Sequence, residues 1–197
     1  MAHAFHFKII LTNSDPVIWR TFQVPADYRM DRFHQVLQIV MGWKNSHLHE
    51  FRINGRTVGM LTDPEYDFDT EDETKLRLSD FNLQERDTLS YLYDFGDHWE
   101  HILYLDHVSK QEFSLPVCTG GKRACPPEDC GGISGYTGML EVLADPRHLE
   151  YEGWKNWLPE GFQSDKAPLD EIKKELKKFG AWHIKHPRKK STPWHQI

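Results

Sequence analysis

Two segments of the chain concentrate residue types that can do chemistry. The first is predicted to be a hairpin with its turn at Gly96, and its candidate residues are Asp94, Asp97, Trp99 and His101. Two carboxylates and a histidine can bind a divalent metal or act as general acid and base. The alternative is structural, because aspartates beside a turn glycine commonly accept hydrogen bonds from backbone amides.

The second segment, residues 116–132, is rich in proline, glycine and cysteine, which predicts a long rigid loop rather than a linker. Its candidate site residues are Arg123, Glu128 and Asp129. Because the two segments lie close in sequence, we expect one composite site. In it, Asp94 or Asp97 should accept hydrogen bonds from Arg123 or from the backbone amides of the loop.

His47 and His49 are further candidates as metal ligands. On a strand, residues two apart point to the same side, so these two imidazoles should share a face. With an aspartate they would suit zinc or another transition metal. The alternative is that they satisfy local backbone groups.

Three cysteines, Cys118, Cys125 and Cys130, all fall in the second segment. Their spacing lacks the close Cys-x-x-Cys pair of common zinc sites, although a three-cysteine site completed by a distant histidine stays open. Cys125 is also a candidate redox nucleophile, because a neighbouring Arg123 could lower the pKa of its thiol. An odd cysteine count argues against a disulfide framework.

The composition predicts one folded domain in the cytoplasm. The chain has 197 residues, of which 39% are hydrophobic, and no apolar run is long enough to span a membrane. Residues 166–197 contain nine basic and three acidic residues, a charge of +6, which leaves −12 for residues 1–165 because the whole chain carries −6. Any contact with nucleic acid should therefore use the basic tail or a local patch.

The hydrophobic pattern predicts an α+β fold: a mixed sheet with a packed helix, a β-grasp-like N-terminal half, and C-terminal helices. We expect a single domain over residues 1–182. In it, residues 5–108 should form the sheet and helix core, residues 109–182 the motif loop and a helical cover, and residues 183–197 a flexible basic tail. The clearest helix is predicted near residues 31–42. The acidic residues 63–73 predict a solvated loop.

The order of the motifs resembles a known family. The matching segments are Met41-Gly-Trp43 with His47-Leu-His-Glu-Phe51, Tyr93–Asp97 with Trp99 and His101, and Cys118–Gly132 with Pro126-Pro-Glu-Asp129. They resemble the open-reading-frame-three-like proteins of root-inducing plasmids, which also occur as passengers of insertion elements. The resemblance implies an α+β fold and covers roughly residues 5–180. Some relatives are labelled resolvases, but no serine here lies among several arginines, as a serine resolvase requires.

Two classes of function remain open from the sequence. One is a non-catalytic binding or accessory module linked to mobile elements or nucleic-acid transactions, which the absence of a catalytic signature favours. The other is a metal-dependent hydrolase with a carboxylate and histidine site, which the convergence of polar residues favours. Whether the protein is an enzyme, and whether a divalent metal is its cofactor, is not decided by the sequence.

Overall fold

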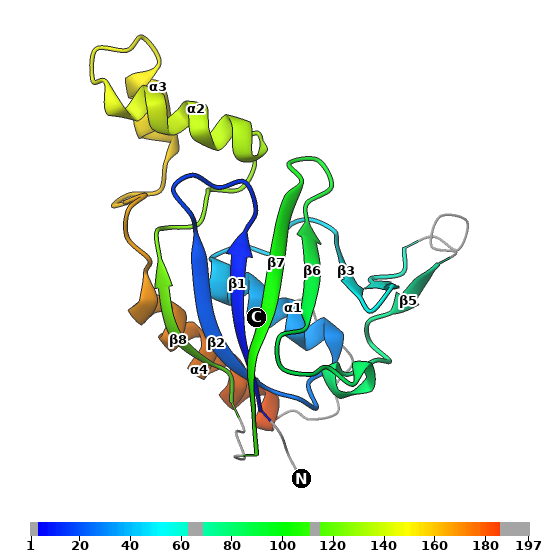
Figure 1. The fold of residues 1–197 in the computed structure, drawn as a ribbon. Helices are drawn as coiled ribbons and strands as arrows, with labels where there is room; N and C mark the ends of the chain where they lie inside the picture. Colours follow the sequence, from blue (N-terminus) through cyan, green and yellow to red (C-terminus); the bar gives the residue numbers. More distant parts are fainter. Residues whose placement is uncertain (1–3, 63–68, 111–114, 186–197) are drawn as a thin grey trace.

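The computed structural model describes residues 4–62, 69–110 and 115–185, with side chains described as far as Trp182. One eight-stranded sheet forms its centre (Figure 1). The strands are β1 Ala4–Leu11, β2 Trp19–Pro25, β3 His49–Ile53, β4 Arg56–Gly59, β5 Thr70–Asp72, β6 Thr88–Tyr93, β7 Trp99–Ser109 and β8 Val117–Lys122. The helices are α1 Met30–Met41, the short 3-10 helix η1 Leu78–Phe81, α2 Gly132–Ala144, α3 Tyr151–Trp157 and α4 Leu169–Lys185.

The strands are arranged in the order β5-β4-β3-β6-β7-β1-β2-β8. Neighbouring strands are antiparallel except for β4 and β5, which are parallel, so the sheet is mixed. The predicted α+β class is confirmed. The predicted order of strand, strand, helix and strand is also found in the N-terminal half.

Period-two alternation sets the buried face of the sheet. In β1, Phe5, Phe7, Ile9 and Leu11 are all buried, as the alternation predicts. Helix α1 lies on this face (Figure 1) and buries Phe33, among others, in a stack of aromatic rings with Phe7 and Phe51. The helix ends at Gly42, whose φ of 107° is left-handed and whose amide donates to the carbonyl of Gln38.

The C-terminal helices divide into two groups. Helix α4 lies beside α1 and packs against β8, with Ile172, Leu176 and Phe179 buried. Helices α2 and α3 pack on each other at one end of the sheet (Figure 1). Helix α4 continues to Lys185, beyond the predicted start of the tail, and residues 186–197 lie outside the described residues.

The predicted loop over residues 116–132 is partly wrong, because it contains the edge strand β8. Gly121, one of the glycines from which the loop was predicted, is required by the packing of this strand. Arg20, a fully buried residue of β2, donates to the carbonyls of Val40 and Lys122. A β-carbon on Gly121 would lie 2.5 Å from the Cδ of Arg20, so only glycine lets the edge strand close over this side chain.

The acidic segment is also only partly as predicted. Residues 63–68 lie outside the described residues, but residues 70–72 form β5 and Glu73 is buried. Burial of Glu73 contradicts the solvated loop predicted for this end of the segment. Among the described residues, no helix combines the length and the apolar character that a membrane span requires.

Candidate functional site

The hairpin turn and the cysteine-rich segment meet in space. The backbone amide of Gly131 donates to Asp97 Oδ2 over 3.2 Å. The hydroxyl of Tyr93, at the end of β6, donates to Glu128 Oε1 over 2.9 Å. The sequence prediction allowed either Arg123 or loop amides as donors, and an amide is the donor observed for Asp97. Arg123 forms no ion pair with a carboxylate among the described residues.

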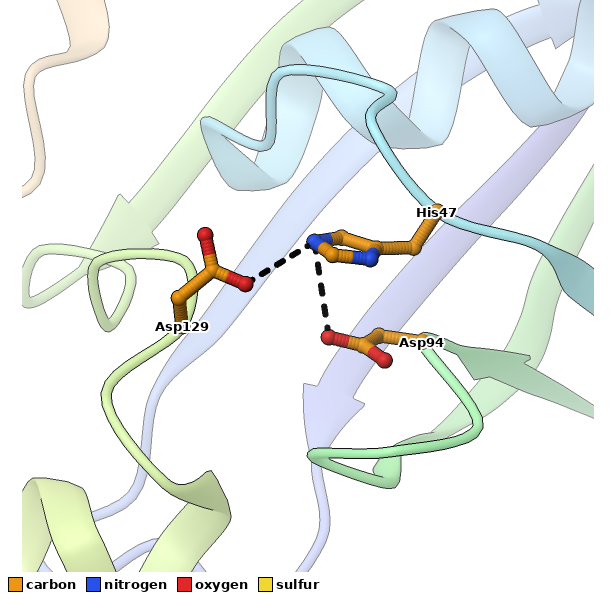
Figure 2. Close-up of side chains that lie close together, drawn as sticks. All are labelled: His47, Asp94 and Asp129. Atoms are coloured by element: carbon orange, nitrogen blue, oxygen red, sulfur yellow. Dashed lines mark ion pairs between the residues drawn. The ribbon is translucent and has the colours of Figure 1, made fainter.

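His47 lies at the junction of these segments (Figure 2). Its Nε2 atom is 3.2 Å from Asp129 Oδ1, 3.6 Å from Asp94 Oδ2 and 3.9 Å from Glu128 Oε2. The four side chains come from three parts of the chain: the loop before β3, the β6–β7 turn, and the segment between β8 and α2. We call this group the carboxylate cluster.

The local backbone aims each carboxylate at His47. Asp94 has a left-handed φ of 59°, and its Oδ1 accepts from the amide of Gly96 over 2.9 Å, which leaves Oδ2 facing the imidazole. Glu128 uses Oε1 to accept from Tyr93 and from the amide of Lys44, so its Oε2 faces His47. Asp129 also has a left-handed φ, of 60°, and its side chain is 71% exposed.

The charges of the carboxylate cluster are unbalanced. In the described part of the chain, no lysine or arginine forms an ion pair with Asp94, Glu128 or Asp129. The Nε2 atom of His47 is buried and has no hydrogen-bond partner of acceptable geometry there. A buried nitrogen that faces several carboxylate oxygens needs either a proton or a metal cation to make the arrangement favourable.

The spacing of these atoms suits a metal ion. Oxygen and nitrogen ligands about 2.1 Å from one cation lie roughly 3.0–3.5 Å apart in adjacent positions. One ligand atom each from His47, Asp94 and Asp129 lies within 4.8 Å of the others, and the side-chain contacts of His47 include 3.2 and 3.6 Å. A set of one imidazole and several carboxylates without a thiolate suits zinc, manganese or ferrous iron better than calcium.

Trp99 and His101, two of the predicted site residues, lie in the core instead. Both are fully buried, and Trp43 packs against them with ring centroids 5.1 and 6.4 Å away. Burial lowers the pKa of His101 to about 4, so its imidazole is neutral at neutral pH. The alternation that predicts a shared face is correct, but that face is the core face of β7.

His47 and His49 do not act together, because β3 begins only at His49 and the alternation does not extend back to His47. His49 faces inward and contacts Glu73. The cysteines do not form a metal site either: among the described residues, the one group with metal-ligand spacing is His47, Asp94 and Asp129.

The surroundings of Cys125 do not favour the redox interpretation. Burial raises the pKa of its thiol well above the ordinary value, and the opposing effect comes mainly from Arg20 rather than from the neighbouring Arg123. Burial also raises the pKa of Cys118, and that of Cys130 to about 12. The three thiols therefore stay protonated at neutral pH, and they pack as small apolar groups.

A second polar group was not predicted from the sequence. It comprises Asp31, His34 and Gln38 on α1, with His49 and Glu73, and all five residues are buried. The signal was present, because residues 31, 34 and 38 are polar at helical spacing on the face of α1 that also carries Leu37. The surrounding apolar residues concealed it.

The fold and the carboxylate cluster define an α+β protein with a candidate metal centre at one end of its sheet. The chain belongs to the family of the plasmid pRiA4b ORF-3-like proteins, which it matches over residues 3–171. It is 34% identical to the uncharacterized protein y4hQ of Sinorhizobium fredii (strain NBRC 101917 / NGR234), over 97% of this chain and all of that protein. It is also similar to the crystal structure of MM3350, a protein of unknown function from Methanosarcina mazei Go1. In that comparison the TM-score is 0.78 and the identity 37%, over 87% of this chain and 98% of the other.

Proposed function

We propose that the protein binds a divalent transition-metal ion at the carboxylate cluster and acts as a metal-dependent hydrolase. The observation that supports this proposal is the buried Nε2 of His47, which faces carboxylate oxygens of Asp94, Glu128 and Asp129. The combined negative charge of these carboxylates favours a bound cation, because a neutral imidazole cannot balance that charge.

The roles of the residues follow from their surroundings. His47 and Asp94 would hold the ion from the protein side. Glu128 is held in place by Tyr93 and the amide of Lys44, as outer-shell partners commonly orient ligating carboxylates. Asp129, which is 71% exposed, lies on the solvent side, where catalytic sites leave room for water and substrate. When bound, such an ion supplies a Lewis acid that lowers the pKa of water to about 7.

Metal analysis of the purified protein tests this proposal. The protein is purified without chelators or immobilised metal, and its zinc, manganese and iron contents are measured by mass spectrometry. We expect one equivalent of metal, and metal-dependent hydrolysis of at least one substrate in a panel of esters, phosphoesters and amides. Protein that contains no metal and binds none when titrated with these ions would refute the proposal.

Asp94→Asn is the sharpest variant. Asparagine tolerates a left-handed backbone and keeps an oxygen for the amide of Gly96, but it loses the charge that faces His47. We expect metal affinity to fall at least ten-fold while the protein stays folded. Asp97→Asn is the matched control, because Asp97 lies in the same turn but accepts from Gly131 and has no contact with His47 in the cluster. It should retain the metal.

The second candidate is a non-catalytic binding or accessory module. It is favoured by the hydrogen bonds through which Asp97 and Glu128 fasten the cysteine-rich segment to the hairpin, because these give the carboxylates a structural role. A link to mobile elements is supported only by the plasmid in the family's description. In this case the cluster holds no metal, and Asp94→Asn lowers the stability of the metal-free protein.

A further inference from the structure

A cleft of about 730 Å³ opens between α1, the loop before β3, and the ends of β4 and β5. This volume lies within the range of small-molecule sites, about 300–1,000 Å³. Three large apolar side chains of the lining, Leu48, Met60 and Leu61, are 39%, 47% and 47% exposed. Exposed apolar residues gathered at one cleft can cover the apolar part of a ligand.

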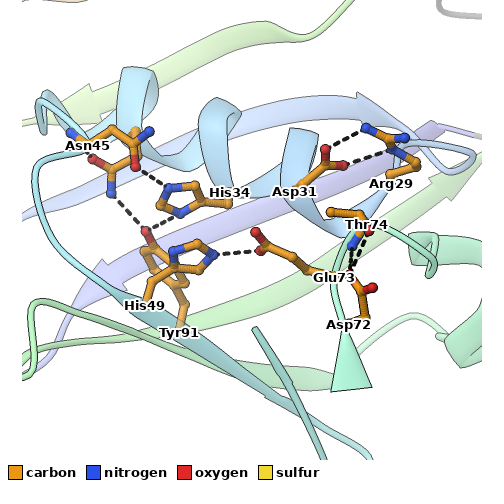
Figure 3. A network of polar contacts seen from close by, with 10 residues as sticks. Arg29, Asp31, His34, Asn45, His49, Asp72, Glu73, Thr74 and Tyr91 are labelled. Atoms are coloured by element: carbon orange, nitrogen blue, oxygen red, sulfur yellow. Dashed lines mark hydrogen bonds and ion pairs between the residues drawn. The ribbon is translucent and has the colours of Figure 1, made fainter. Parts of the chain in front are cut away.

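The polar lining of this cleft is a connected network (Figure 3). His49 Nε2 and Glu73 Oε2 are 2.7 Å apart, and the ring of His49 stacks on the ring of His34 with centroids 3.4 Å apart. His34 contacts the Asn45 amide oxygen through Nε2 and the Tyr91 hydroxyl through Nδ1. Because an amide oxygen only accepts, His34 donates through Nε2. Burial lowers the pKa of His34 to about 3, so its imidazole is neutral and its Nδ1 accepts from the Tyr91 hydroxyl.

The carboxylates of the cleft differ in how their charges are balanced. Asp31 forms a two-pronged ion pair with Arg29, and Asp72 pairs with Lys75 over 3.0 Å. Glu73 has no lysine or arginine partner within the described ranges, although its side chain is only 8% exposed. The lining described for this cleft contains three carboxylates and no lysine or arginine.

We infer that this cleft binds a small organic cation, a primary amine with an apolar body, whose ammonium group pairs with Glu73. The apolar body would contact Leu48, Met60 and Leu61, and the ammonium group would supply the positive charge that Glu73 lacks. An anionic ligand is disfavoured, because it would face Glu73, whose charge no lysine or arginine of the described residues balances. His47, which belongs to the carboxylate cluster, also lines this cleft, so the test below measures binding with and without a chelator to separate this inference from the metal proposal.

The protonation state of Glu73 predicts a pH dependence of ligand binding, which is a second test of this inference. Burial raises the pKa of Glu73 to about 7, and the ionisable groups around it are His34, Asp31, Asp72 and Arg29. His49, which contacts it directly, is neutral because burial lowers its pKa to about 3. An ammonium ligand should bind only the ionised form of Glu73. Its apparent affinity should therefore rise roughly ten-fold between pH 6 and pH 8, as the ionised fraction increases.

The test uses three probes with the same six-carbon chain: hexylammonium, hexanol and hexanoate. Binding to the full chain is measured by calorimetry, in the presence of a chelator and in its absence. We expect hexylammonium to bind at least ten-fold more tightly than hexanoate, with hexanol between them, and with the pH dependence described above. Hexanoate that binds as tightly as hexylammonium, or hexylammonium that does not bind, would overturn the inference.

Glu73→Gln assigns the binding to this residue. Glutamine has the same shape and can still hydrogen-bond His49, so the variant should fold, which circular dichroism checks. We expect hexylammonium binding to weaken at least ten-fold and to lose its pH dependence. Glu71→Gln is the matched control, because Glu71 lies two residues away, pairs with Arg56 and is not part of the cleft lining. Unchanged hexylammonium binding in Glu73→Gln would contradict the assignment. The metal content of this variant is measured as well, and an unchanged metal content would show that the two sites are separate.

Discussion

Gly132 and Asp97 are in direct backbone contact, which joins the start of α2 to the β6–β7 turn. A β-carbon built on Gly132 would lie 2.5 Å from the carbonyl oxygen of Asp97, and the φ of Gly132 is left-handed, at 66°. The same two segments contribute Asp94, Glu128 and Asp129 to the carboxylate cluster. The contact therefore joins the two segments that carry the carboxylates facing His47.

Gly132→Ala tests this relationship. An alanine must either push Asp97 away or move α2, and its backbone is strained at this φ, so we expect a loss of roughly 1–3 kcal/mol in the free energy of unfolding. Urea denaturation measures it. We also expect weaker metal binding, because the carboxylates separate.

Gly138→Ala is the control for this change. Gly138 lies in the interior of α2, and a β-carbon there would meet nothing within 4 Å. Alanine favours a helix interior over glycine by roughly 0.5–1 kcal/mol, so this variant should be slightly more stable than the parent. If both variants unfold like the parent, the contact between Gly132 and Asp97 is looser than described.

The register of α1 gives a second prediction. Leu37 is fully buried between the helix and the sheet, so Leu37→Ala should lower the free energy of unfolding by roughly 2–5 kcal/mol. Ile39 is only partly buried, and Ile39→Ala should have a clearly smaller effect. Equal losses for the two variants, measured by thermal or urea unfolding, would show that the helix is rotated relative to this description.

Regular periodicity explains which parts of the fold could be predicted from the sequence. The alternation in β1 and the helical spacing of Phe33, Leu37 and Val40 are local signals, and the elements formed where these signals predict them. Strand β8 could not be predicted from local periodicity. Its Gly121 is required by Arg20, a residue about 100 positions away, and a contact of that kind leaves no local signal.

The candidate site was predictable only in part, for a similar reason. The convergence of the hairpin turn with the cysteine-rich segment follows from their unusual composition, which identified Asp94, Asp97, Glu128 and Asp129. The same composition could not show that Trp99 and His101 face the core, because alternation fixes a shared face but not which face is buried. Glu73 belongs to an acidic run, and its burial depends on tertiary contacts with His49 and α1.

Thiol reactivity gives a third prediction. Because burial raises the pKa values of all three cysteines, the native protein at pH 7.5 should react with iodoacetamide at least ten-fold more slowly than the denatured protein does. Mass spectrometry of the labelled peptides distinguishes Cys118, Cys125 and Cys130. Rapid labelling of Cys125 in the folded protein would support the redox interpretation instead.

The pH dependence of stability gives the last prediction. Burial lowers the pKa values of His34 and His49 to about 3 and that of His101 to about 4. Between about pH 4.5 and 6.5 these histidines are neutral in the folded protein but protonated in the unfolded chain, so unfolding takes up about three protons. Glu73, with its pKa raised to about 7, has the opposite effect and releases about one.

On unfolding, these four groups together should therefore take up about two protons near pH 5.5, which contributes a loss of roughly 2–3 kcal/mol of stability for each unit that the pH falls in this window. Urea denaturation at several pH values measures the slope. His101→Phe removes one of the three buried imidazoles and should reduce the slope by roughly 1.4 kcal/mol per pH unit. His98→Asn is the control, because it removes an exposed histidine of the hairpin turn, at a left-handed φ that asparagine tolerates, and leaves the three buried imidazoles in place. A parent protein whose stability is constant from pH 6.5 to 4.5 would show that these histidines are not buried in neutral form.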